Sequence, residues 1–375
     1  MDSGPEYLAT DSQQRVLTAL RCGQPDRVPV LVHINPYVED WYTYVPSYAD
    51  ALSAANGFGD VVFNWDLPAP FMFTAGERWI EQRDLGGGRI EQIIHTPDGP
   101  LTEVAHRGWR ERDVIKRWIQ TADDADRALS MPYVPIRPDL SDFLNTASRL
   151  AGRAVSQVTF CEPIALADWI DEGTLATWRK SERGLLRQLL DTAFERLADG
   201  LRTCLDAGAG PLYVSRRGRL SGLEHLPLTD IEELIVGYAR RLVELIHAYE
   251  GTVVIWQGGG RIGPLLDVLP SIGMDGLTVV DPPLSGDCDL HQLKACIGDR
   301  ACIVASLPYD ELARASTDRI GGLIRAVLQA GARGGGLILS PCAALQRRDL
   351  PEKVSENLVY YLETAHRLGR YPIQI

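Results

Sequence analysis

Eight short runs rich in valine and isoleucine recur along this chain, and most are followed by a segment with helical spacing. Runs that are apolar throughout are typical of parallel strands buried on both faces. Strands that alternate with helices predict a parallel α/β fold, and eight such units are the number that closes a (β/α)₈ TIM barrel. A doubly wound open sheet is the alternative. The runs are residues 28–34, 60–66, 154–160, 210–215, 252–257, 276–281, 301–307 and 335–342.

Helical patterns fill most of the intervals between these runs. Residues 183–207 have apolar side chains three and four positions apart, and Gly208 offers a stop. Thr229 precedes a segment with two glutamates, which predicts that it caps a helix. Further helices are expected over residues 263–272, 289–297, 317–330 and 351–368.

One stretch, residues 77–121, interrupts this rhythm. It contains the turn clusters 85–88 and 97–100, each between segments suited to antiparallel strands. We therefore expect an antiparallel hairpin insertion after the second strand, within one barrel domain that spans residues 1–375.

Composition limits the partners of the chain. The formal net charge of −12 disfavours nucleic acid and anionic membranes, because both are bound by clustered lysine and arginine. A small anionic substrate remains compatible with a locally basic pocket. The chain has seven cysteines with no CxxC pair, and it has no long apolar run. These features predict reduced thiols, no transmembrane helix and a cytoplasmic location.

Several segments resemble the uroporphyrinogen decarboxylase superfamily, and they occur in the same order as in that superfamily. They are residues 15–20, 25–30, 96–101, 227–229, 281–283 and 334–341. The resemblance covers nearly the whole chain and implies a TIM-barrel enzyme that acts on a small molecule.

The decarboxylases of this superfamily imply three site features. The first is a paired-arginine segment after strand one, but residues 33–40 contain no arginine. The second is an aspartate after strand two, where Asp66 stands. The third is a histidine after strand eight, where Cys342 and two alanines stand. One of the three features is therefore present.

The zinc-dependent methyltransferases of the superfamily imply a His-x-Cys-Gly motif after strand five and a cysteine after strand eight. The first motif falls on Gln257, Gly258, Gly259 and Gly260, so that its histidine and cysteine are replaced. Cys342 lies near the last ligand position. We therefore predict no zinc at this place, while a corrinoid methyl donor stays open.

Catalytic groups of TIM barrels lie at the carboxyl ends of the strands. This rule predicts three catalytic residues: Asp66, Glu162 and Cys342. It also predicts substrate-binding residues, which are His33, Asn35, Arg216, Arg217, Gln257, Asp281 and Tyr309. Asp66 and Glu162 suit proton transfer, and an arginine after strand four suits an anionic group. The alternatives are loop carboxylates that cap backbone N–H groups, a salt bridge at Glu162, solvated arginines and an inert buried thiol.

The leading hypothesis is a divergent superfamily enzyme that transfers a methyl or other one-carbon group without the usual zinc site. The first alternative is a decarboxylase or other lyase, which shares Asp66. The second alternative is a non-catalytic barrel that binds a corrinoid or a tetrapyrrole. A corrinoid carrier protein and a homodimer are the open partner hypotheses.

Overall fold

Eight parallel strands form the main sheet, and this sheet closes into a barrel. A computed structural model of the chain describes residues 11–69, 72, 74, 80–107, 113–216, 226–257, 262–279, 289–341 and 348–375. The strand order is β1-β2-β7-β8-β9-β10-β11-β12. A parallel bridge joins Val30 to Leu339, and the N–H of Leu339 donates to the carbonyl of Pro29 at 2.9 Å. The last strand therefore meets the first, which confirms the barrel and not the open sheet.

Each predicted strand is present with bounds close to those expected, although the first is shorter. The barrel strands are β1 (Leu31–Val32), β2 (Asp60–Asp66), β7 (Ala154–Cys161), β8 (Leu212–Arg216), β9 (Thr252–Gln257), β10 (Gly276–Val279), β11 (Cys302–Ser306) and β12 (Leu337–Ser340).

Alternate residues of each barrel strand face either the interior or the surrounding helices, because successive side chains of a strand point to opposite sides. Leu212 and Val214 of β8 belong to the inner core, whereas Tyr213 between them belongs to the outer core. The inner core also contains Val16 and Leu20 of helix α1 (Ser12–Leu20). Helix α1 therefore covers the amino ends of the strands.

A buried ion cluster fastens α1 to the barrel. The carboxylate of Asp60 is fully buried and accepts from Arg15 at 2.6 Å and from Arg27 at 2.7 Å. It also accepts from the backbone N–H of Val30 at 2.8 Å. Arg15 reaches Asp26 at 2.7 Å as well. The partners of Asp60 and Asp26 itself lie in the first two segments of the superfamily resemblance, so that those segments have a structural role at the amino end of the barrel.

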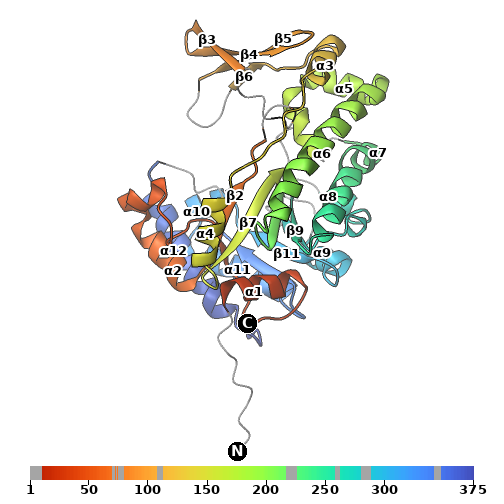
Figure 1. The fold of residues 1–375 in the computed structure, drawn as a ribbon. Coiled ribbons are helices and arrows are strands. Elements are labelled where there is room, and N and C mark those ends of the chain that lie inside the picture. Colours follow the sequence, from red (N-terminus) through yellow and green to blue (C-terminus); the bar gives the residue numbers. More distant parts are fainter. Residues whose placement is uncertain are drawn as a thin grey trace, which may run out of the picture.

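The predicted insertion is a four-stranded antiparallel sheet in the order β3-β4-β5-β6. Gly87 and Gly88, both with positive φ, form the turn between its first two strands. Figure 1 shows this sheet at one end of the molecule, with α1 and the C-terminus at the other end. Its strands are β3 (Ile80–Gly86), β4 (Arg89–Thr96), β5 (Gly99–His106) and β6 (Asp113–Lys116).

Helices surround the barrel, except that α1 covers its amino end and α3 (Ala122–Leu129) lies beside the inserted sheet (Figure 1). Besides α1 and α3 they are α2 (Ala49–Phe58), α4 (Ser141–Arg149), α5 (Glu172–Ser181), α6 (Arg183–Asp206), α7 (Leu228–Ile231), α8 (Gly237–His247), α9 (Leu290–Ile297), α10 (Tyr309–Arg314), α11 (Thr317–Gly331) and α12 (Glu352–Leu368). Within the described ranges, none of them has the length and apolar character that a membrane crossing requires.

Two helix predictions are wrong. Thr229 does not cap a helix, because α7 begins one residue earlier and Pro227 occupies the cap position. Residues 263–272 form two short 3-10 turns, Gly263–Leu265 and Leu269–Ser271. The proline of the second turn lacks an N–H and would clash with the preceding helical turn, so a continuous helix cannot pass through it.

Candidate functional site

The carboxyl ends of β2, β7 and β8 bring the main candidate residues together. These strands are neighbours, and Asp66 lies opposite Thr159 while Cys161 lies opposite Arg216. Counting alternate positions from the inner-core residues Val62, Val155 and Val214 places all four of these side chains on the interior side. We call the region formed by Asp66, Thr159, Cys161 and Arg216 the mouth.

Asp66 and Arg216 form an ion pair across the mouth, although 150 positions separate them in the chain. Their side chains are 55% and 46% exposed. A pair this exposed contributes at most about 1 kcal/mol to stability. The guanidinium has five N–H donors, of which Asp66 uses only part. Arg216 can therefore bind a carboxylate or phosphate of a substrate at small cost.

Asn64, two residues before Asp66, holds this pair in position. Its Oδ1 accepts from Gln157 at 2.9 Å and from the hydroxyl of Thr159. Its Nδ2 donates to Asp66 Oδ1 at 3.1 Å. A chain of hydrogen bonds thus runs from Gln157 through Asn64 and Asp66 to Arg216.

Our prediction from the sequence did not include Asn64, Gln157 and Thr159. The available signal was polar residues at alternate positions in otherwise apolar strands: Asn64 and Asp66 in β2, and Gln157 and Thr159 in β7. Such a spacing places polar side chains on one face of each strand.

Glu162 lies on the other side of the sheet. Its carboxylate is 1% exposed and accepts from the hydroxyl of Ser215 at 2.6 Å. Ser215 is adjacent to the inward-facing Val214 and Arg216, so its side chain points toward the helices. The backbone N–H of Glu162 also donates to the carbonyl of Arg216 at 2.8 Å. Glu162 therefore supports the strand that carries Arg216 and does not share the mouth with Asp66.

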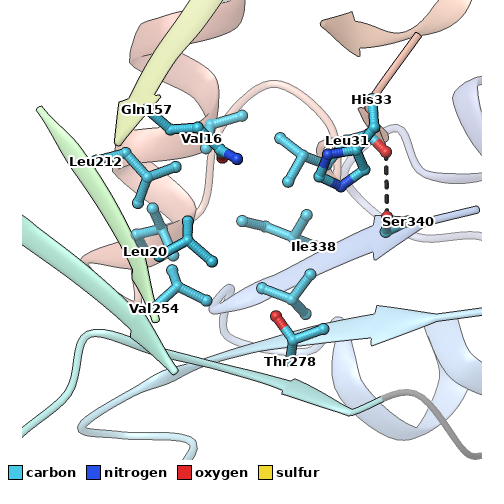
Figure 2. A pocket seen from close by; sticks show the side chains of 12 residues that line it. Val16, Leu20, Leu31, His33, Gln157, Leu212, Val254, Thr278, Ile338 and Ser340 are labelled. Atoms are coloured by element: carbon cyan, nitrogen blue, oxygen red, sulfur yellow. Dashed lines mark hydrogen bonds between the residues drawn. The ribbon is translucent and has the colours of Figure 1, made fainter. Parts of the chain in front are cut away.

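His33 faces the interior of the barrel beneath the mouth. It lines a small cavity together with Gln157, Thr278 and Ser340 (Figure 2). Burial lowers the pKa of the imidazole to about 4, so the ring is neutral at pH 7. A neutral imidazole here can donate or accept a hydrogen bond but cannot attract an anion by charge.

The side chain of Asn35 bonds to β2 and to the loop after β1. The amide of Asn35 is buried, with Nδ2 donating to the carbonyl of Val62 at 3.1 Å and Oδ1 accepting from the N–H of Tyr37 at 2.8 Å. Asn35 therefore fastens the loop after β1 to β2. Tyr309 is half-buried and begins helix α10.

The thiol of Cys161 is an inward-facing group that our prediction also left out. Burial raises its pKa, and this effect exceeds the opposing influence of the Arg216 charge. The thiol therefore stays protonated near neutral pH, which makes it a weak nucleophile.

Four predicted site residues have side chains that the structure does not describe. Gln257 ends β9, but only its backbone is described, and Arg217, Asp281 and Cys342 lie outside the described residues. In the described part of the chain, no group of three or more histidine, cysteine, aspartate or glutamate side chains gathers as metal ligands would. The expectation of no zinc still depends on the sequence replacements at positions 257 and 259.

Comparisons with known proteins agree on the fold. A methyltransferase from Methanosarcina mazei has a TM-score of 0.60 at 17% sequence identity, over 96% of this chain and 99% of its own. A candidate vitamin-B12-independent methionine synthase from Listeria monocytogenes has a TM-score of 0.42 at 20% identity, over 61% of this chain and 69% of its own. At these identities the first comparison shows a shared fold alone, and the second carries no argument. A search of curated protein sequences gives no match.

The family comparison covers the larger part of the sequence. The model described as "Uroporphyrinogen decarboxylase (URO-D)" matches residues 170–367, which is more than half of the chain. This region begins just before α5 and continues through β12 into α12. It contains Arg216 and the strands from β8 onward. The chain therefore belongs to the uroporphyrinogen decarboxylase (URO-D) family.

Proposed function

We propose that this chain is a divergent enzyme of its family that transfers a methyl or other one-carbon group to or from a small anionic molecule. The observation that carries the proposal is the exposed Asp66–Arg216 pair at the mouth. The pair places a cation, which can bind an anionic group, next to a carboxylate, which can accept a proton. A methyltransferase with the same fold, from Methanosarcina mazei, agrees with this choice of reaction.

The site residues divide the work between binding and proton transfer. Arg216 binds the carboxylate or phosphate of the substrate by a charge-assisted hydrogen bond. Asp66 lies next to that anion and accepts the proton of the group that is methylated. Asn64 keeps the Asp66 carboxylate at a fixed angle through its Nδ2 donor. Glu162 acts on Arg216 indirectly, through Ser215 and the backbone of β8.

A carboxylate base suits methyl transfer when zinc ligands are lacking. Zinc otherwise holds an acceptor thiol as a thiolate. With Gln257 and Gly259 at the motif positions, we assign the proton of the acceptor to a protein group instead. As the lone pair of the acceptor forms a bond to the methyl carbon, Asp66 takes the proton of the acceptor. The bonding pair of the broken bond leaves with the methyl donor, for which a corrinoid on a carrier protein is the proposed class.

Decarboxylation is the second candidate, and one specific observation favours it. Asp66 stands at the strand-two position where the resemblance places the aspartate of the decarboxylases. It lies beside a cation that can orient a substrate carboxylate. The two candidates differ in product, because one adds or removes a methyl group and the other releases CO₂.

The test is a reaction screen with the purified full-length chain. Small mono- and dicarboxylic acids are incubated with and without methylcobalamin as the methyl donor, and products are identified by mass spectrometry. We expect a methylated acid that depends on the donor. Loss of CO₂ without the donor supports the second candidate, and no conversion in either arm contradicts both and favours a binding barrel.

Two arginine variants assign the activity to the mouth. Arg216→Gln removes the cation, and we expect a loss of at least tenfold in kcat/KM through the loss of a charge-assisted bond. Arg137→Gln is the matched control, because Arg137 forms an exposed pair with Asp199 on helix α6 at 2.8 Å, outside the barrel. An equal effect of both substitutions would contradict a role for Arg216 in binding.

A further inference from the structure

A small cavity lies inside the barrel, between helix α1 and the mouth. Its volume is about 20 Å³. Most of its wall is apolar and comes from the inner core, including Leu20 of α1. Four polar side chains also line it: His33, Gln157, Thr278 and Ser340. Figure 2 shows them around the space, with each coming from a different strand or strand end.

Gln157, one of these four lining residues, has an unused acceptor. The residue is 4% exposed, and its Nε2 donates to Asn64 Oδ1 at 2.9 Å. Its Oε1 is buried and has no hydrogen-bond partner among the described residues. An unpaired buried carbonyl oxygen costs roughly 1–3 kcal/mol, and such groups are normally satisfied by protein or by ordered water.

The direction of the hydrogen-bonded chain requires this orientation of Gln157. Arg216 can only donate, and the Asp66 carboxylate can only accept. Asn64 must therefore present Nδ2 to Asp66, which leaves its Oδ1 for Gln157. A rotated Gln157 amide would place two oxygens face to face. The ion pair at the mouth thus fixes the direction of every hydrogen bond in the series. The carbonyl oxygen of Gln157 remains as an acceptor at the inner end, so its missing partner must be a donor.

We propose that the cavity binds one water molecule, which donates to Oε1 of Gln157. A single water needs about 10–15 Å³ of such space and two to four polar partners. The hydroxyl of Thr278 and the ring of His33 supply further partners in the wall. The water is the inner end of a chain that continues through Gln157, Asn64 and Asp66 to Arg216. This assignment does not depend on which reaction the mouth performs.

Other occupants fit the wall less well. An apolar molecule would leave Oε1 of Gln157 unpaired. A cation would lie in a low-dielectric space that has no carboxylate in its lining. Two waters would need about 20–30 Å³, which is at or above the volume of about 20 Å³. The volume of the cavity and the polar groups in its wall therefore fit one neutral hydrogen-bond donor of the size of water.

The first test is a high-resolution crystal structure of the unmodified chain. We expect one isolated density peak inside the barrel, within hydrogen-bond distance of Gln157 Oε1 and of at least one other polar group in the wall. An empty cavity overturns the proposal. Density too large for water, or a peak that does not contact Gln157, overturns it as well.

Variants extend the test to solution, where oxygen-17 relaxation dispersion of water counts long-lived internal waters. Gln157→Met keeps the length of the side chain but removes the acceptor, so we expect one fewer long-lived water. Ser156→Ala, at the neighbouring outward-facing position, should leave the count unchanged. If Gln157→Met fails to fold, Thr278→Val replaces it and should shorten the residence time of the water. An unchanged count and residence time in both cavity variants contradict the site.

Discussion

His33 links the stability of the chain to pH, because its ring is enclosed by the barrel. Above pH 6.5 the imidazole is neutral in both the folded and the unfolded chain and has no effect. Below pH 6.5 the unfolded chain takes up a proton, which the folded chain does not accept until about pH 4. The free energy of unfolding should therefore fall by roughly 2 kcal/mol between pH 6.5 and 5 from this residue alone.

Urea denaturation of two histidine variants at pH 7 and pH 5 measures this effect. His33→Gln should show a smaller loss of stability on acidification than the unmodified chain. His95→Gln should behave like the unmodified chain, because the side chain of His95 is exposed on β4. Equal losses in all three proteins would show that His33 is not the group responsible.

At the scale of single residues, the sequence predicted only part of the candidate site. The strand-end rule selected both Asp66 and Arg216, which form an ion pair in the structure, because the rule identifies the end of a barrel at which side chains meet. It does not identify the face. Glu162 is one position beyond Cys161, and this single step turns its side chain toward Ser215 and the outer helices. The alternation of side chains along β7, counted from the inner-core residue Val155, determines that difference.

At the scale of elements, the contact between α1 and the barrel depends on the buried carboxylate of Asp60. Asp60→Asn removes one charge from a cluster that contains Arg15 and Arg27, and it leaves Arg27 without its ion-pair partner among the described residues. Loss of one member of a buried ion pair costs about 3–5 kcal/mol. We expect a decrease of this size in the free energy of unfolding, together with faster amide exchange in α1.

The control for this prediction is an exposed carboxylate of similar chemistry. Asp310→Asn alters a pair with Arg314 at 3.9 Å, in which both side chains are largely exposed. We expect a change well below 1 kcal/mol from it. A similar small change for Asp60→Asn would mean that the ion cluster does not fasten α1 to the barrel.

Elements with strong periodicity were predictable, and elements decided by local backbone chemistry were not. The 24-residue helix α6 has a continuous apolar stripe, and its predicted and observed bounds nearly coincide. The segment 263–272 has an equally apolar composition, but its internal proline leaves only short turns. The inserted sheet was predictable because its turns contain glycines that accept positive φ.

For the molecule as a whole, the sequence predicts a protein without stoichiometric zinc. The replacements Gln257 and Gly259 remove two ligands that the methyltransferase branch implies. We expect elemental analysis of the purified chain to give far less than one zinc per chain. The double substitution Gln257→His with Gly259→Cys is the informative comparison, because with Cys342 it recreates the ligand types of that branch and should increase zinc binding. One tightly bound zinc in the unmodified chain would contradict the zinc-independent reaction.

The register between β2, β7 and β8 limits the kinds of mutation by which this site can change during evolution. Loss or gain of one codon between Ala154 and Gln157 would turn Gln157, Thr159 and Cys161 outward together, since side chains alternate along the strand. Loops between strands can change length without such an effect. New specificities in this lineage should therefore arise by amino-acid replacement at the strand ends and by loop-length changes, and in-frame indels within β7 should be selected against.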